Sequence, residues 1–244
     1  MMTDRTTARV VGSLFIVASV AGVVGLAIQQ SVLDSSTYLS EAALKQNQVA
    51  TGAILELVMG IAVIGIAIAI YPVLRRRTER LALGYVVARS IEAVIYVIGS
   101  VVVLTILTVS RGFLDAGSPD ASHYQTLGGV LLAVRDWAGH GVQDAAVFCV
   151  GALILNYALY RASLVPRWLS VWGLVGASLY LAAGALVIYG LEPLSTPQVV
   201  LEAPLGVQEI VLAVWLIVKG FDVPTPALGL GKEPAPAQRQ DALT

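Results

Sequence analysis

Long apolar segments alternate with short polar ones along most of the chain. Six segments have about 20 mostly apolar residues, the length that an α-helix needs to cross the hydrocarbon core of a bilayer. Isolated segments of this kind can satisfy their backbone hydrogen bonds in lipid only as helices, and the apolar alternation of a membrane barrel is missing. The pattern predicts an all-α, polytopic membrane protein with six transmembrane helices in one bundle, at about 10–28, 51–71, 82–108, 141–160, 169–190 and 204–220.

Composition supports this class and divides the chain in two. Hydrophobic residues make up 57% of the sequence and charged residues 13%, far from the balance of an ordinary globular domain. Residues 1–221 are expected to form the membrane domain, with the lipid bilayer as its environment. Residues 222–244 are rich in Pro, Ala and Gly without apolar periodicity, and we predict a disordered tail. No basic surface suggests a nucleic-acid partner.

The distribution of basic residues predicts an orientation. Lys and Arg are enriched in the cytoplasmic loops of membrane proteins, and six spans bring both termini to the same side. We therefore expect cytoplasmic N- and C-termini. The first apolar run is too long for a typical signal peptide, so it is counted as a span. Eleven of the 15 basic residues fall on one side: Arg5, Arg9, Arg75, Arg76, Arg77, Arg80, Arg161, Arg167, Lys219, Lys232 and Arg239.

An additional helix is predicted between the third and fourth spans. The sequence SPD at 118–120 has a capping hydroxyl, a proline and an acid in the order that begins a helix. Apolar residues then recur at helical spacing, which indicates an amphipathic helix over about 119–137, along the outer interface or slanting into the bundle. It meets the fourth span at the sequence GHG, 139–141, where two glycines are expected to weaken or kink the helix.

Ionisable side chains interrupt the predicted spans at five positions. Hydrocarbon is a poor solvent for charge, and an Arg, Lys or Asp at the centre of a membrane helix costs about 2.5–3.5 kcal/mol on insertion scales. Such residues are expected to face a protein interior, where they often mark a pathway or a pocket. The five are Glu56, Arg89, Glu92, Asp144 and Glu209.

Helical spacing places these residues on faces that they share with small or polar side chains. Arg89 and Glu92 are three residues apart, so an ion pair within the third span is feasible. Small residues allow close helix approach, and we expect the faces to turn toward one another. The face of the third span has Tyr85, Arg89, Glu92, Tyr96 and Gly99, and that of the second has Gly52, Glu56, Gly60 and Ala67. The face of the sixth span has Glu202, Gly206, Glu209 and Ala213, and the start of the fourth has Asp136, His140 and Asp144 with the adjacent Gln143.

Small residues also mark the first span. Ala18 and Gly22, and likewise Ala21 and Gly25, are four residues apart, a spacing typical of close helix contacts. The contact could form within one chain or between two copies, so a homo-oligomer is one of the expected arrangements.

These residues favour three functional hypotheses. In the first, the protein is transporter-like or senses a ligand, and the membrane residues bind a small polar ligand or exchange protons. In the second, it is an intramembrane hydrolase in which His140, Asp136 and Asp144 hold a divalent metal that activates water. In the third, the polar network only fixes helix packing in a structural or accessory protein. The site of the first hypothesis comprises Glu56, Arg89, Glu92, Tyr96, His140, Gln143, Asp144 and Glu209.

Motifs of known catalytic chemistry do not support the hydrolase. The sequence has only two histidines and no H-E-x-x-H spacing. No Ser or Cys stands beside a histidine in a nucleophile motif, and no glycine-rich phosphate loop is found. We therefore expect no cofactor, and the residues favour a protein that is not an enzyme.

Four segments together resemble a known bacterial family. They are ARVVGSLFIVASVAGVVG near the N-terminus, ARSIEAVIYVIGS with Arg89 and Glu92, LYRASLVPRWLSVWGLVGASLYLAAG, and PLGVQEIVLAVWLIVKGF. The chain is similar over about residues 8–221 to the membrane family catalogued as domain of unknown function 4386. The resemblance implies a six-helix protein of the bacterial inner membrane, and it supplies no activity or site.

Overall fold

The computed structural model describes residues 4–115 and 117–222, without the side chains of 117–120, 144 and 145. Every regular element in these ranges is helical, which confirms the all-α class. The predicted tail lies outside the described residues, apart from Asp222. The helices are α1 (Asp4–Leu33), α2 (Tyr38–Leu44), α3 (Gln46–Asp115), α4 (Gly117–Asp136), the π-helix η1 (Trp137–Phe148), α5 (Cys149–Ala162), α6 (Arg167–Ile188) and α7 (Thr196–Val218).

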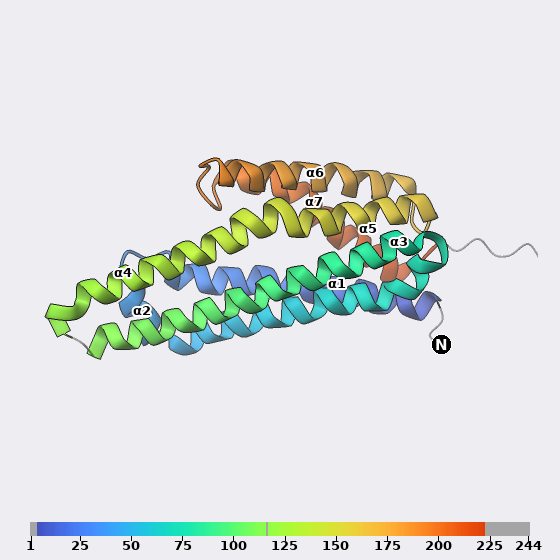
Figure 1. Ribbon diagram of the computed structural model, residues 1–244. Coiled ribbons are helices and arrows are strands. Elements are labelled where there is room, and N and C mark those ends of the chain that lie inside the picture. The colour runs from blue at the N-terminus through green and yellow to red at the C-terminus, as the bar shows by residue number, and fades with distance from the viewer. Residues whose placement is uncertain (1–3, 116, 223–244) are drawn as a thin grey trace, which may run out of the picture.

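The longest element, α3, is a hairpin of two antiparallel arms (Figure 1). Its 70 residues follow helical geometry except at Thr78, where φ is −147° and ψ is 69°. The arms correspond to the predicted second and third spans, and the reversal lies within the arginine-rich turn expected between them. Five described helices are long and apolar enough to cross a membrane, and the two arms of α3 bring the number of helical segments to six.

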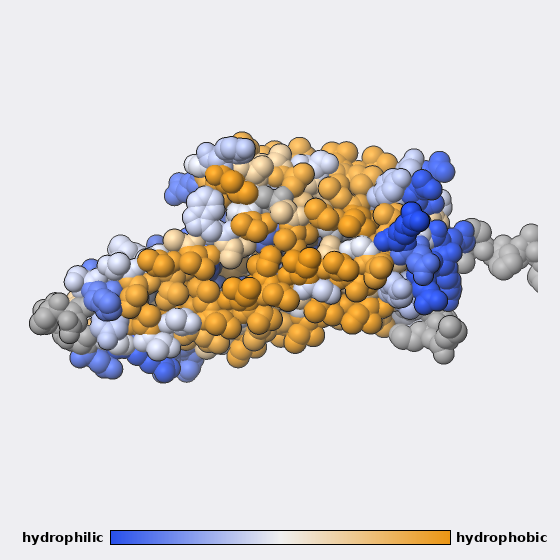
Figure 2. Space-filling view, viewed as in Figure 1, coloured by the Kyte–Doolittle hydropathy of each residue, from blue (hydrophilic) through white to orange (hydrophobic). Residues whose placement is uncertain are grey.

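The surface of the bundle carries an apolar belt between two polar ends (Figure 2). Large hydrophobic side chains are exposed along it, including Val23 at 71%, Ile61 at 73% and Ile68 at 61%. A soluble protein rarely exposes so much apolar surface, so the belt has the character of a surface in contact with lipid. The N-terminus, the α3 turn and the α5–α6 turn lie at one end, which we call the basic end because it holds Arg75, Arg76, Arg77, Arg80, Arg161 and Arg167.

Glycines set how closely α1 approaches its neighbours. A Cβ atom on Gly52 would lie 3.2 Å from the backbone oxygen of Gly25, so α1 and the first arm of α3 are in near backbone contact. A Cβ on Gly22 would meet the sulfur of Met59 at 2.5 Å. These small residues of the first span therefore pack within the chain. Nearer the basic end, α1 crosses α7 at Gly12, whose Cβ would lie 2.6 Å from the Ala213 carbonyl oxygen.

The segment before the fourth span is continuous with it. Helix α4 leads into η1 and then α5 without a break, so the helix predicted at 119–137 extends in line with span four (Figure 1). The weakness predicted at 139–141 takes the form of π-helical hydrogen bonding over Trp137–Phe148. A π-helix removes the regular i→i−4 pattern, and such segments are frequent at functional sites.

The segment between the first two spans is also mostly helical. Residues 29–50 carry polar side chains, but α1 continues to Leu33, α2 follows, and α3 begins at Gln46. As a consequence, Gln29 belongs to a membrane helix and is buried, with 4% of its surface exposed.

Candidate functional site

Arg89 and Glu92 form a buried ion pair on the second arm of α3. The Nη1 atom of Arg89 donates to both carboxylate oxygens of Glu92, at 3.0 and 2.8 Å, and Nε donates to the Tyr85 hydroxyl at 3.0 Å. The side chains of Arg89 and Glu92 are 2% and 1% exposed. At 1.5 Å per residue, Arg89 lies about 16 Å along the helix from Thr78, which is about half the 30 Å thickness of the hydrocarbon core of a bilayer.

A second carboxylate reaches the same guanidinium from α7. The Nη2 atom of Arg89 lies 3.6 Å from the Oε1 atom of Glu209. That separation permits Coulombic attraction but exceeds hydrogen-bond length, and Nη2 has no hydrogen-bond partner among the described side chains. The guanidinium also lies over the rings of Tyr85 and Phe148, at 5.3 and 5.5 Å from their centroids. Arg89 is therefore held at Nη1 and Nε, and among the described residues its Nη2 retains an unused donor.

Glu56 occupies a separate position, on the first arm of α3. Its Oε2 atom accepts a hydrogen bond of 3.3 Å from the Gln29 side chain, and the Oε1 of Gln29 accepts one of 3.2 Å from Arg135. The carboxylate packs against Gly99, where any side chain would collide with it. A small residue on the facing arm thus creates the space that this buried acid occupies.

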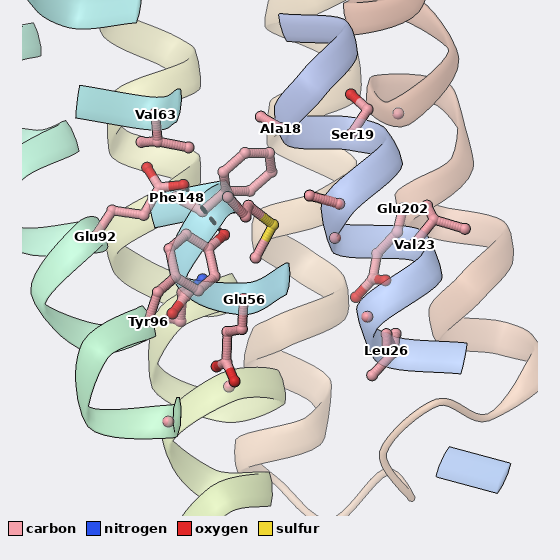
Figure 3. Close-up of a pocket in the computed structure, with 18 of the residues that line it drawn as sticks. Ala18, Ser19, Val23, Leu26, Glu56, Val63, Glu92, Tyr96, Phe148 and Glu202 are labelled. Carbon is pink, nitrogen blue, oxygen red and sulfur yellow. Dashed lines mark hydrogen bonds between the residues drawn. The ribbon is translucent and has the colours of Figure 1, made fainter. Parts of the chain in front are cut away.

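Seven of the eight side chains predicted as a site line one cavity of about 610 Å³. Figure 3 shows Glu92 and Tyr96 projecting into it from one arm of α3 and Glu56 from the other, with Ser19, Val23 and Leu26 of α1 on the far side. The hydroxyl of Tyr96 donates to Glu92 at 3.3 Å. The seven are Glu56, Arg89, Glu92, Tyr96, His140, Gln143 and Glu209. The side chain of Asp144, the eighth, lies outside the described residues.

Side chains that the prediction omitted also line the cavity. Gln29 follows Gly25 at the same four-residue spacing as Ala21 and Gly25, so its face could have been found from the sequence. Glu202 was placed on the inward face of the sixth span but left out of the site, and it accepts a hydrogen bond of 2.7 Å from Gln198. Arg135 lines the cavity and forms an ion pair with Asp136 at 3.2 Å.

The residues of the hydrolase hypothesis are divided between two cavities. His140 lines the large cavity, whereas Asp136 lines a neighbouring one of about 330 Å³. Among the described residues, no group of three or more His, Cys, Asp and Glu side chains is arranged to hold a metal ion. The predicted set includes the undescribed side chain of Asp144, so it stays a prediction.

A further buried polar cluster lies outside the cavity. Gln208 of α7 donates to the Asn156 side chain of α5 at 3.1 Å and to the Leu169 carbonyl of α6 at 3.2 Å. Asn156 in turn donates to the Ala152 carbonyl at 2.9 Å and packs against Gly173. These bonds join three helices by means of neutral side chains, and this cluster has the properties of a packing element.

Comparison with known proteins gives a family and no activity. A family model described as a domain of unknown function (DUF4386) matches residues 10–220. The chain belongs to the DUF4386 family. The match includes residues from all six helical segments and every described residue of the cavity. No curated protein and no solved structure matches this DUF4386 chain, so its function has to be argued from the cavity.

Proposed function

We propose that this DUF4386 protein is transporter-like or ligand-sensing and that its cavity binds a small ligand or exchanges protons. The observation that carries the proposal is the convergence of charged side chains from α3, α4 and α7 on one cavity of about 610 Å³ inside the bundle. Ionisable residues in such positions are costly and commonly mark ion, proton or substrate pathways. A network with only a structural role would not require an open cavity.

The carboxylates have different tasks in this proposal. Glu92 neutralises Arg89 through two hydrogen bonds, and this pair orients the guanidinium. Glu209 is more exposed, at 17%, and it lies beyond hydrogen-bond reach of Arg89. A proton or a ligand group can therefore associate with Glu209 without first breaking the Arg89–Glu92 pair. Glu56, bound by the neutral Gln29, is a second exchangeable group.

The basic end is assigned to the cytoplasmic face of a bacterial inner membrane, because cytoplasmic loops carry the excess of Lys and Arg. We expect an alkaline phosphatase reporter inserted after Lys45, in the far-end loop, to be active outside the cytoplasm. The same reporter after Glu79, in the α3 turn, should be inactive. The reverse pattern of activity would refute this orientation.

Ligand binding should raise the melting temperature of the purified protein. A ligand present at 100 times its Kd adds about 2.7 kcal/mol to the free energy of unfolding if it binds only the folded state. We expect a metabolite panel to contain compounds with this effect, and the effect to be lost in Glu209→Gln. Glu79→Gln is the matched control because Glu79 is exposed at the basic end, away from the cavity.

Proton exchange can be measured in the same samples with a pH indicator. Addition of a stabilising compound in weak buffer should change the signal of a pH indicator, and Glu209→Gln or Glu56→Gln should reduce that change. A panel that leaves the melting temperature and the indicator unchanged would count against the proposal. An equal response of wild type and both cavity variants would place binding elsewhere.

A further inference from the structure

The cavity has an opening in the apolar belt, between α1 and α7. Three of its large apolar lining side chains are also exposed on the molecular surface: Val23 at 71%, Val207 at 53% and Ile210 at 39%. Gly206 lines the cavity as well, and a Cβ atom there would have no neighbour within 4 Å. Residues that face both the cavity and the outer surface of the bundle lie at a passage between the cavity and that surface.

The crossing of α1 and α7 explains where this passage lies. The helices are in near backbone contact at Gly12 and Ala213, toward the basic end. Beyond that point α1 follows α3, with Gly25 against Gly52, while α7 packs on α6. The two helices therefore diverge toward the far end. Because the exposed residues at the gap are Val, Ile and Gly, the passage leads to lipid.

The charges around the cavity are unbalanced toward the negative. Its described lining residues include Glu56, Glu92, Glu202 and Glu209, against Arg89 and Arg135. Arg135 is paired with Asp136, and Arg89 is bound by Glu92. Glu56 and Glu202 each accept a hydrogen bond from a neutral amide side chain. A positive charge in the cavity would offset this excess, in a low-dielectric setting where the compensation is strong.

The remaining groups define the rest of the ligand. Most of the wall is apolar, and the rings of Phe15, Tyr96, Phe148 and Tyr180 line it, which suits an apolar body and attracts a cation. Within the described part of the chain, the Nη2 atom of Arg89 is a buried donor without a hydrogen-bond partner, beside Glu209. It can donate to an oxygen on the ligand or to a water molecule that accompanies it.

We infer that the ligand is a lipophilic organic cation, which enters the cavity from the bilayer between α1 and α7. This inference rests on the proposed function and specifies its substrate class. The cationic centre lies near Glu209 and Glu56, and the apolar body lies between α1 and the rings of the cavity. A hydrophilic metabolite would partition poorly into a gap lined by Val23, Val207 and Ile210.

Tetraphenylphosphonium and tetraphenylborate provide a direct test, because they have nearly the same shape and opposite charges. Equilibrium binding to protein in nanodiscs, corrected with empty nanodiscs, should show saturable binding of the phosphonium. We expect at least tenfold weaker binding of the borate and of tetramethylammonium, which has the charge without the apolar body. Glu209→Gln and Glu56→Gln should each weaken phosphonium binding by about tenfold, the equivalent of 1.4 kcal/mol.

A substitution at the gap tests the entry route. Gly206→Trp should slow phosphonium association at least fivefold, because the indole would fill the open space beside the cavity. Val214→Trp is the matched control on the same helix, since Val214 is exposed but does not line the cavity, and it should bind at the wild-type rate. Equal rates in both variants would overturn entry between α1 and α7.

The outcomes distinguish the ligand class from the proposed function. Equal affinity for the phosphonium and the borate would overturn the cationic assignment. If tetramethylammonium bound as tightly as the phosphonium, the inference that the ligand has an apolar body would be wrong. Absence of phosphonium binding, together with a melting shift from a polar metabolite that needs Glu209, would reject this inference and leave the proposed function in place.

Discussion

Replacing Arg89 with Met should lower the free energy of unfolding by about 3–5 kcal/mol, because removal of one partner leaves a buried charge without compensation. Glu92 would lose two hydrogen bonds from the guanidinium and keep the one from Tyr96. Unfolding in mixed detergent and dodecyl sulfate micelles measures this change. It is the largest single-residue effect that we expect in the molecule.

Two further variants show whether the loss of stability comes from the unpaired buried charge. Arg76→Met removes an exposed arginine that pairs with Asp4 at 3.0 Å, and such surface pairs contribute about 0–1 kcal/mol. The double variant Arg89→Met with Glu92→Gln removes both buried charges and should recover most of the lost stability. If Arg89→Met cost no more than Arg76→Met, the buried pair would have no role in holding the bundle together.

Replacing Gly12 with Ala should lower the free energy of unfolding by about 1–3 kcal/mol, the usual range for overpacking a closely packed site. The new methyl group would lie 2.6 Å from the backbone oxygen of Ala213, and a backbone atom cannot move aside as a flexible side chain can. Helices α1 and α7 would have to separate where they cross. The same unfolding measurement applies.

Gly129→Ala is the control for the intrinsic effect of alanine in a helix. Gly129 lies in α4, where a Cβ atom would have no neighbour within 4 Å. Alanine is favoured over glycine in a helix by about 0.5–1 kcal/mol, so this variant should be as stable as wild type or slightly more stable. Equal stability of the Gly12 and Gly129 variants would contradict the close crossing of α1 and α7.

The spans could be predicted because each depends on a local property of the sequence. A run of about 20 apolar residues has few alternatives to a membrane helix, wherever its neighbours lie. The ends of the helices depend on more than hydropathy. Helix α1 continues beyond residue 28 through Gln29, Gln30 and Ser31 to Leu33, and α3 continues through its arginines until Thr78, where the backbone reverses. Polar residues such as these are compatible with helix, so hydropathy alone did not reveal the extensions.

The site was predictable as far as it depends on spacing within one helix. Arg89 and Glu92 are three residues apart, and their pairing follows from helix geometry alone. Glu56 is bound by Gln29 of α1, which is itself bound by Arg135 of α4, and these contacts depend on how the helices cross, which a single sequence does not specify. Gln29 was missed because the predicted first span ended at residue 28, although the spacing of Ala21 and Gly25 extends to it. The division of His140 and Asp136 between two cavities likewise required coordinates.

The pairing of Arg89 with a residue on its own helix has a consequence for biosynthesis. A nascent chain emerges from its N-terminus onward, so the α3 hairpin is made well before α7. Arg89 already has Glu92 beside it at that stage, and the hairpin can leave the translocation machinery without waiting for Glu209. The last helix then supplies a second acid and one wall of the cavity. The order of synthesis therefore allows the charged hairpin to insert before α7 completes the cavity.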